Sequence, residues 1–175
     1  MPETSWRDAA PNRAGGSFGL IPQFEAGALN GAAPRPNWWP IRKRLALAAE
    51  WARSPVLDVG AGTGWLTFHL AHWGHDVTAC DYSARARASF EKNATILACD
   101  LAIANEDVSH LSYPDKAFAS LFCISVLPYV EDLQGALDEL YRVLRPRGIA
   151  VVGCLNAYGS FALINDRTRS SYATA

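Results

Sequence analysis

The residues best suited to chemistry are an acid and a run of glycines, in the segment Asp58-Val59-Gly60-Ala61-Gly62-Thr63-Gly64. Glycine at alternate positions permits a tight backbone turn and leaves space for a ligand to approach the main chain. A helical pattern begins directly after it, at Trp65, so a ligand at this turn is expected to meet the free N–H groups of a helix N-terminus. The acid beside the turn favours a ligand that carries positive charge.

The spacing of this segment distinguishes two kinds of nucleotide-binding turn. A dinucleotide-binding turn reads G-x-G-x-x-G, requires a small residue where this chain has Trp65, and places a diphosphate where Asp58 would repel it. The pattern Asp58-x-Gly60-x-Gly62-x-Gly64 resembles instead the first motif of the class I S-adenosylmethionine-dependent methyltransferases. The resemblance implies that Asp58 and the glycine turn, with Ala61 and Trp65, bind the cofactor and engage its methionine part.

A second acid ends the next predicted strand, Asp76–Asp81. Asp81 lies 23 positions after Asp58, and an acid at the tip of a second strand can accept hydrogen bonds from both hydroxyls of an adenosine ribose. The alternative is that Asp81 is only the N-terminal charge of the next helix, which Ser83 would cap. We expect the ribose role, with Tyr82 beside it in the cofactor site.

Further matches to the family follow in the family's order. The family has an acid after the third strand that contacts the adenine amino group, and the resemblance gives this role to Asp107, with Val108 beside it. Leu144–Gly148 resembles the family's Leu-Lys-Pro-Gly-Gly turn, with Arg147 in place of a glycine. The loop after Asp107 matches the family at Leu111, Pro114, Asp115 and Phe118 and departs from it at Ser112 and Ala119.

The segment after the fourth predicted strand supplies the remaining candidates. The resemblance implies that Ser125–Tyr129 form the floor beneath the transferred methyl group, with Ser125 in the cofactor site. The sulfonium already activates that methyl group, so the protein mainly has to hold a nucleophile in line with it. A base is needed only for a protonated acceptor. His110 and Tyr129 are the candidates for this base. The alternative for His110 is a loop residue without a chemical role, and the alternative for Tyr129 is an aromatic residue that only packs.

The elements that position these residues alternate between strand and helix patterns. We predict a Rossmann-like three-layer α/β sandwich with a mainly parallel sheet of about five strands, for which the resemblance implies the order 3-2-1-4-5. The spacing of Leu133, Leu137, Leu140 and Leu144 predicts the clearest helix. The strands are predicted at Val56–Val59, Asp76–Asp81, Leu101–Asn105, Leu121–Ile124 and Ile149–Leu155, and another helix at Trp65–Trp73, before Gly74.

The division of the chain is predicted from its composition. Residues 1–39 form a flexible leader and candidate lid, in which Trp38 and Trp39 either close over the cofactor or staple the domain surface. Residues 40–156 form the cofactor-binding methyltransferase domain and 157–175 a short helix with a polar tail. A first helix over 40–53 is expected to bury Ile41, Leu45, Ala48 and Trp51.

The family's C-terminal antiparallel pair is predicted to be missing, because only about twenty residues follow the fifth strand. That apolar strand would then be a bare edge of the sheet. We expect either self-association through this edge or a truncated form of a longer enzyme.

Composition limits the classes of function. The chain has 175 residues, half of them hydrophobic, and a net charge of −1, which predicts one globular domain with no global bias toward nucleic acid. Its four cysteines form no close pair and the N-terminus shows no signal peptide, which favours a reduced, cytoplasmic setting. No membrane association is expected. His69, His72 and His75 invite a metal site, but a polar helix face explains them better, and we predict no metal.

Together these features predict a methyltransferase that uses S-adenosyl-L-methionine and moves its methyl group to an O, N or C nucleophile of a small-molecule acceptor. Two alternatives stay open. One is a truncated or non-catalytic protein that binds the cofactor as a partner. The other is an NAD(P)-binding Rossmann enzyme, which Asp58 and Trp65 disfavour.

Overall fold

The structure is a computed structural model that describes residues 38–153, with side chains described from residue 44 onward. The predicted leader and lid, including the side chains of Trp38, Trp39 and Ile41, lie outside this description. The predicted C-terminal helix, polar tail and missing antiparallel pair also lie outside it, because they concern residues 154–175.

A five-stranded parallel sheet forms the centre of the described region, with the order β3-β2-β1-β4-β5. Every neighbouring pair in it is parallel. The predicted fold class and strand order are therefore confirmed. The strands are β1 (Val56–Val59), β2 (Val77–Cys80), β3 (Ile103–Ala104), β4 (Phe118–Ile124) and β5 (Leu144–Gly153).

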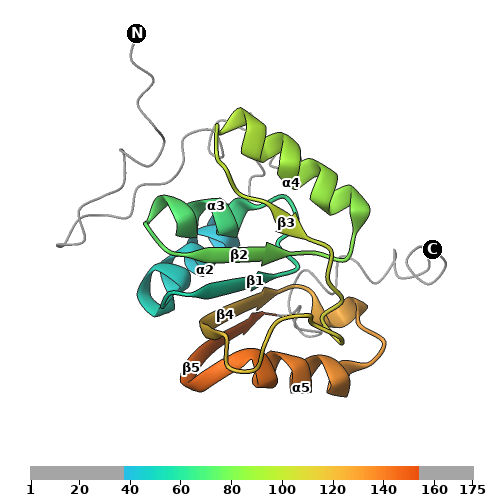
Figure 1. The fold of residues 1–175 in the computed structure, drawn as a ribbon. Helices are drawn as coiled ribbons and strands as arrows, with labels where there is room; N and C mark the ends of the chain where they lie inside the picture. The colour runs from blue at the N-terminus through green and yellow to red at the C-terminus, as the bar shows by residue number, and fades with distance from the viewer. Residues whose placement is uncertain (1–37, 154–175) are drawn as a thin grey trace, which may run out of the picture.

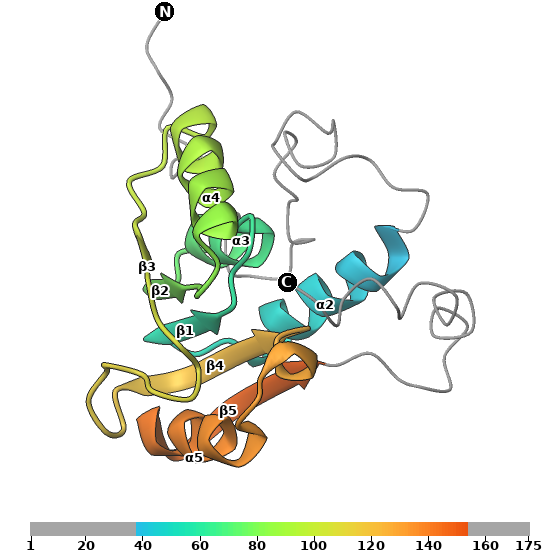
Figure 2. The same ribbon diagram turned by 90° about the vertical axis from the view of Figure 1, so that its right-hand side faces the viewer.

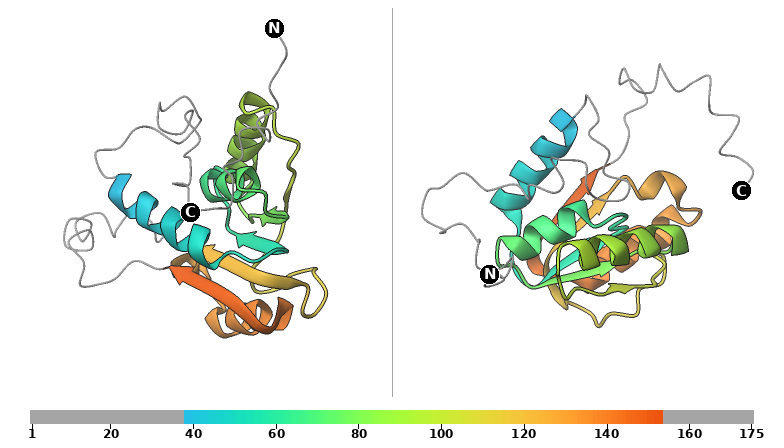
Figure 3. Two further views of the ribbon diagram at one scale, coloured as in Figure 1. Left: turned by 90° about the vertical axis from the view of Figure 1, so that its left-hand side faces the viewer. Right: turned by 90° about the horizontal axis from the view of Figure 1, so that it is seen from above.

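Helices cover both faces of this sheet. In Figure 1, α2, α3 and α4 lie on one side of the strands and α5 on the other, and the turned views of Figure 2 and Figure 3 agree. This arrangement is the three-layer sandwich that the alternation of patterns predicts. The helices are α2 (Trp38–Trp51), α3 (Trp65–His72), α4 (Ala84–Ile96), the 3-10 turn η1 (Leu127–Tyr129) and α5 (Leu133–Val143).

The core follows from the alternation of side chains along β1. Val56 packs with Leu70 of α3 on one face, whereas Leu57 and Val59 pack with Leu140 of α5 on the other. All four residues of β1 are buried, as expected for the central strand of a sheet covered on both faces. Because β1 is packed on both faces, its end has a defined position, and so does the glycine turn that follows it.

β2 is one residue shorter at each end than predicted, and three other strands differ more from the predictions. β4 begins at Phe118 rather than Leu121, and β3 has two residues rather than five. β5 contains the segment that was predicted as a turn, because Phe118 pairs with Leu144 and Ser120 already pairs with Ile149. The segment between those two pairs is thus a large irregularity within the strand rather than a separate turn.

The buried face of α2 differs from the prediction, and that of α5 does not follow the spacing of its leucines. The expected burial of Trp51 is wrong, since 42% of it is exposed while the smaller Ala48 and Ala52 occupy the interior at this end of α2. In α5, Leu133 and Leu137 are 47% and 41% exposed. The face that packs on the sheet instead carries Ala136, Leu140 and Val143.

Candidate active site

A cleft of about 710 Å³ opens at the carboxyl ends of the strands. Parallel strands end at one edge, so side chains that follow different strands meet there. Eight of the residues singled out from the sequence line this cleft: Gly60, Asp81, Tyr82, Asp107, Val108, His110, Ser125 and Tyr129. Five others are not among the lining residues: Asp58, Ala61, Gly62, Gly64 and Trp65.

Asp81 stands at the tip of β2 and connects the two turns beside the cleft. Its Oδ2 accepts a hydrogen bond from the Gly62 N–H at 2.9 Å, and its Oδ1 accepts one from the Ser83 N–H at 2.8 Å. A carboxylate has about four acceptor positions, so two remain for donors in the cleft. Ser83 also caps α4 through its side chain, as the alternative role for this segment predicted. Capping by Ser83 and ligand binding by Asp81 are therefore compatible.

Four N–H groups of the glycine turn are already bonded within the protein. The N–H groups of Gly60 and Ala61 both donate to the Cys80 carbonyl oxygen, at 2.8 and 3.0 Å. The Gly62 N–H donates to Asp81, and the Gly64 N–H donates to the Ala61 carbonyl oxygen. These four groups are occupied because the turn closes on itself and on β2, whereas the prediction concerned the first N–H groups of the helix that begins at Trp65. A diphosphate would find these donors already used.

The space beside the glycines is filled differently at each position. A Cβ on Gly60 would overlap with the side chain of Val126, which lines the cleft, and a Cβ on Gly64 would overlap with the rings of Phe68 and Phe90. Only at Gly62 is the space open, and there a φ of +59° favours glycine. Gly60 and Gly64 therefore serve packing in this structure, whereas Gly62 leaves room outside the turn.

Asp58 lies beneath the turn rather than in the cleft wall. It is 3% exposed, and its Oδ2 accepts a hydrogen bond of 2.6 Å from the Thr67 hydroxyl of α3. Burial raises the pKa of Asp58 to about 7, with a smaller contribution in the same direction from Asp81, while the Thr67 bond opposes the rise. A positive charge nearby would favour the ionised form of this carboxyl group.

A short loop after β3 forms the opposite wall. Asp107 Oδ1 accepts a hydrogen bond from the Ser109 N–H at 2.9 Å, and its carbonyl oxygen accepts one from the His110 N–H at 2.9 Å. These two bonds fold the loop so that the exposed Asp107 and the buried Val108 both line the cleft. His110 is exposed at the same rim.

The floor of the cleft begins at a strained residue. Ser125 has a φ of +63°, which non-glycine residues rarely adopt, and its N–H donates to the Gly153 carbonyl oxygen of β5 at 2.6 Å. Tyr129, in the turn that follows, is 73% exposed, and Tyr82 on the other side of the cleft is 75% exposed. Two aromatic rings thus stand at the rim.

Several lining residues could not be singled out from the family pattern. Glu106, Ser109, Glu131 and Asp132 all line the cleft. A signal existed for Asp132, because an Asp before an apolar helical run predicts an N-cap, and its side chain indeed accepts from the Gly135 N–H. No comparable signal distinguishes the other three.

The charge of the lining is one-sided. Among the described residues that line the cleft, five are acids and none is lysine or arginine. The acids come from three separate segments: Asp81, Glu106, Asp107, Glu131 and Asp132. A cleft lined in this way attracts cationic groups and repels phosphates.

The three histidines singled out from the sequence do not meet. His69 is buried in α3 with a ring nitrogen bonded to the Trp65 carbonyl oxygen, and burial lowers its pKa to about 4. The His75 ring instead lies 3.1 Å from the Ser54 hydroxyl. Within residues 38–153, no three His, Cys, Asp or Glu side chains gather as a metal site would require.

Comparison with known proteins gives consistent matches. The family described as "Methyltransferase domain" matches residues 57–152, more than half of the chain. The demethylmenaquinone methyltransferase of Tropheryma whipplei strain Twist is 38% identical over 107 residues, which are 58% of this chain and 41% of that protein. The tRNA 5-carboxymethoxyuridine methyltransferase of Escherichia coli K12 is 34% identical over 142 residues, 76% of this chain and 52% of that protein.

A solved structure supports the fold. The PH0226 protein from Pyrococcus horikoshii superposes with a TM-score of 0.67 at 21% identity, covering 85% of this chain and 65% of that one. The chain spans about half the length of the curated relatives it matches. In the part of the chain that the structure describes, no helix has both the length and the apolar character for a membrane crossing. By family match and fold, the chain belongs to the methyltransferase domain family, the type 11 group of class I S-adenosylmethionine-dependent methyltransferases.

Proposed function

We propose that this protein binds S-adenosylmethionine in the cleft at the carboxyl edge of its sheet and transfers the methyl group to a small-molecule acceptor. The observation that carries the proposal is Asp81, a half-buried carboxylate at the tip of β2 with two acceptor positions left for ligand hydroxyls. Asp107 on the facing wall is the proposed partner of the adenine amino group.

The residues of the cleft fit this cofactor. The bound cofactor would supply an activated methyl group on a positively charged sulfur. Five lining acids give that charge a favourable field, and the buried Asp58 behind the turn adds to it. The used N–H groups of the glycine turn argue against the NAD(P) alternative, since a diphosphate depends on such donors.

The same charges favour a neutral or cationic small molecule as acceptor. The T. whipplei relative is named for a demethylmenaquinone acceptor and the E. coli relative for a tRNA. A phosphate backbone would be repelled by a lining with five acids and no lysine or arginine among the described residues. Tyr82 and Tyr129 at the rim offer apolar faces to a planar acceptor.

His110 and Tyr129 remain the proposed bases for an acceptor that arrives protonated. Both side chains belong to the lining of the cleft and are exposed, so either could reach an acceptor proton directly or through one water. A cytoplasmic location is part of the same proposal, because the cofactor is an intracellular metabolite.

Calorimetric titration with S-adenosylmethionine, S-adenosylhomocysteine and NADH, side by side, tests the proposal. We expect the first two to bind and NADH not to bind. Asp81→Ala should weaken binding by about 1–3 kcal/mol, the usual loss for charge-assisted hydrogen bonds. The matched control is Asp100→Ala, which removes an exposed acid outside the cleft lining and should leave the affinity unchanged. Binding of NADH, or equal affinity of a folded Asp81→Ala variant, would overturn the assignment.

A further inference from the structure

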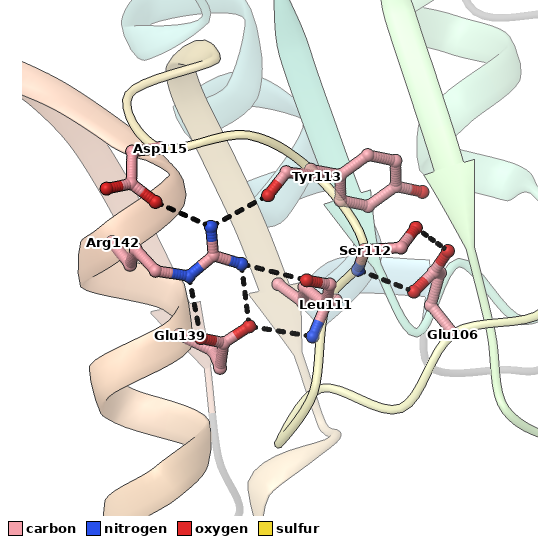
Figure 4. Close-up of polar contacts among 7 residues, drawn as sticks. All are labelled: Glu106, Leu111, Ser112, Tyr113, Asp115, Glu139 and Arg142. Atoms are coloured by element: carbon pink, nitrogen blue, oxygen red, sulfur yellow. Dashed lines mark hydrogen bonds and ion pairs between the residues drawn. The ribbon is translucent and has the colours of Figure 1, made fainter.

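One polar network outside the cleft contacts the loop that forms its wall. Arg142 lies in the last turn of α5 and is absent from the cleft lining. Figure 4 shows its guanidinium between the acid of the preceding turn, Glu139, and the segment 111–115. This segment continues directly from the cleft wall 106–110. The contact therefore joins α5 to the wall from behind.

The guanidinium of Arg142 uses all five of its N–H groups. Nε and one Nη2 proton donate to the two oxygens of Glu139, at 2.7 and 2.8 Å, as a bidentate pair. The other three donors reach the loop: Nη2 to the Leu111 carbonyl oxygen, and Nη1 to the Tyr113 carbonyl oxygen and to Asp115 Oδ1, each at 2.8 Å. No donor capacity is left, so the arginine has one defined position.

Glu139 completes the contact from the other side of the same residue, Leu111. Its Oε2 also accepts a hydrogen bond from the Leu111 N–H at 2.7 Å. The N–H and the carbonyl oxygen of Leu111 are thus both held by the α5 pair, while the Leu111 side chain is buried beneath them. The side chains of Glu139 and Arg142 are 20% and 30% exposed, so this pair is shielded enough for its geometry to be enforced.

The loop between this contact and the cleft is short and stiff. Glu106 accepts hydrogen bonds from both the N–H and the hydroxyl of Ser112, which closes the loop at its base. The Asp107 bonds to Ser109 and His110 close it internally. A displacement at Leu111 would therefore be transmitted to the Asp107–His110 segment rather than absorbed.

We propose that Arg142 and Glu139 are positioning residues for this cleft: they touch no ligand but fix the wall 106–110 in its binding conformation. The inference rests on the proposed function for its ligand. It goes beyond that function because it assigns an effect on ligand affinity to two residues of α5 that lie outside the cleft lining. Arg142→Gln should lower the population of the competent wall. The apparent affinity falls in proportion to that population. If the variant's wall is in the binding conformation about one tenth of the time, its affinity for the ligand falls about tenfold.

The test measures the dissociation constant of S-adenosylhomocysteine by calorimetry, well below each variant's melting temperature, together with amide hydrogen exchange without ligand. The informative amides are those of Ser109 and His110, whose acceptors belong to Asp107 and not to the α5 pair. Arg142→Gln should speed their exchange and weaken binding about tenfold. Glu139→Gln should do the same to a smaller degree, and Arg142→Lys should restore part of both.

Two controls separate positioning from general stability. Arg53→Gln removes an exposed arginine whose Nη1 also donates to two backbone carbonyl oxygens, those of Glu50 and Ala52, next to the amino end of β1. It should change neither affinity nor exchange in the wall. Asp115→Asn removes the 70% exposed partner of Arg142 and should have little effect on either.

The outcomes distinguish this inference from the proposed function. Unchanged exchange at Ser109 and His110 in Arg142→Gln would overturn it, and so would faster exchange with unchanged affinity. Failure of the wild-type protein to bind S-adenosylhomocysteine would overturn the proposed function. Faster exchange in Arg142→Gln would even then support the role of Arg142 and Glu139 in holding the wall 106–110. If Arg142→Gln does not fold, Glu139→Gln and Arg142→Lys give the same two readouts.

Discussion

At the scale of single residues, Asp58 shows how a motif residue can be placed correctly and still act in an unexpected way. The sequence pattern predicts an acid on the strand before the glycine turn. The structure buries that acid against Thr67, behind the turn and outside the cleft lining. A buried carboxyl group is costly to ionise, so the protonation state of Asp58 affects the stability of the fold.

This coupling predicts a pH dependence of stability. The pKa of Asp58 is raised from 3.8 to about 7 by folding, so the folded state holds a proton that the unfolded state releases between these pH values. The contribution of this group to the free energy of unfolding therefore falls as pH rises from 3.8 to about 7 and is constant above. Asp58→Asn, which stays neutral, should remove that slope and be more stable than wild type above pH 7.

Urea unfolding curves from pH 4 to 8 measure this slope, with Asp100→Asn as an exposed-acid control. A constant offset between wild type and Asp58→Asn at every pH would show that the acid is not protonated by burial.

The cofactor gives a second comparison. Because a nearby positive charge favours the ionised carboxylate, S-adenosylmethionine should stabilise wild type more at pH 8 than at pH 5.

At the scale of elements, the irregular first half of β5 carries a local strain at a position where the sequence departs from the family pattern. Arg147 occupies a position where the family pattern has glycine, and its φ is +63°. A left-handed conformation costs a non-glycine residue about 1–2 kcal/mol. The side chain is exposed, so no burial offsets this cost.

Arg147→Gly should therefore stabilise the protein. Relief of about 1–2 kcal/mol of strain outweighs the entropy that glycine adds to the unfolded chain, about 0.4–1 kcal/mol, and leaves a net gain of up to about 1.6 kcal/mol. Thermal unfolding should show a rise of a few degrees in Tm, roughly 2–6 °C per kcal/mol for a domain of this size. Arg145→Gly, at an exposed neighbour without a positive φ, should lower the Tm. A lower Tm for Arg147→Gly would mean that its side chain contributes more than its backbone costs.

The ends of the parallel strands show what sequence patterns can predict in this protein. A parallel sheet brings the carboxyl ends of its strands to one edge, and the family resemblance assigned Asp81, Asp107 and Ser125 to segments that follow three strands, so all three line one cleft. The closed hydrogen bonding of the glycine turn could not be predicted in this way, because the donors of Gly60 and Ala61 find their acceptor on β2. Periodicity reports burial and carries no information about such pairings.

The orientation of α5 is a second feature that hydrophobic spacing does not indicate. Its leucine spacing indicates a stripe through Leu133 and Leu137, but the helix is turned so that Ala136 and Val143 face the sheet. This rotation brings the side with Glu139 and Arg142 against the loop at 111–115. Arg142 meets its loop partners across 27 to 31 positions of sequence, and a hydrophobic pattern cannot register a polar contact of that range.

At the scale of the whole molecule, the outer position of β5 is the feature with the widest consequence. Within residues 38–153, β5 pairs with β4 alone, so one of its edges is open in the described region. The strand is apolar from Ile149 to Gly153, and Val152 is 45% exposed. The first half of β5 carries the exposed Arg145 and Arg147, but from Ile149 onward no charged side chain opposes pairing with another chain.

We therefore expect concentration-dependent self-association through β5. Size-exclusion chromatography with light scattering should show a mass that rises above the chain mass of 19.0 kDa as concentration increases. Val152→Lys should hold the protein at the monomer mass, since a lysine on an edge strand opposes pairing. The matched control is Ile96→Lys, which adds the same charge at a 50% exposed aliphatic position of α4 and should associate like wild type. A wild-type protein that stays monomeric at every concentration would mean that this edge is covered, and equal effects of the two lysines would mean that association depends on net charge rather than on β5.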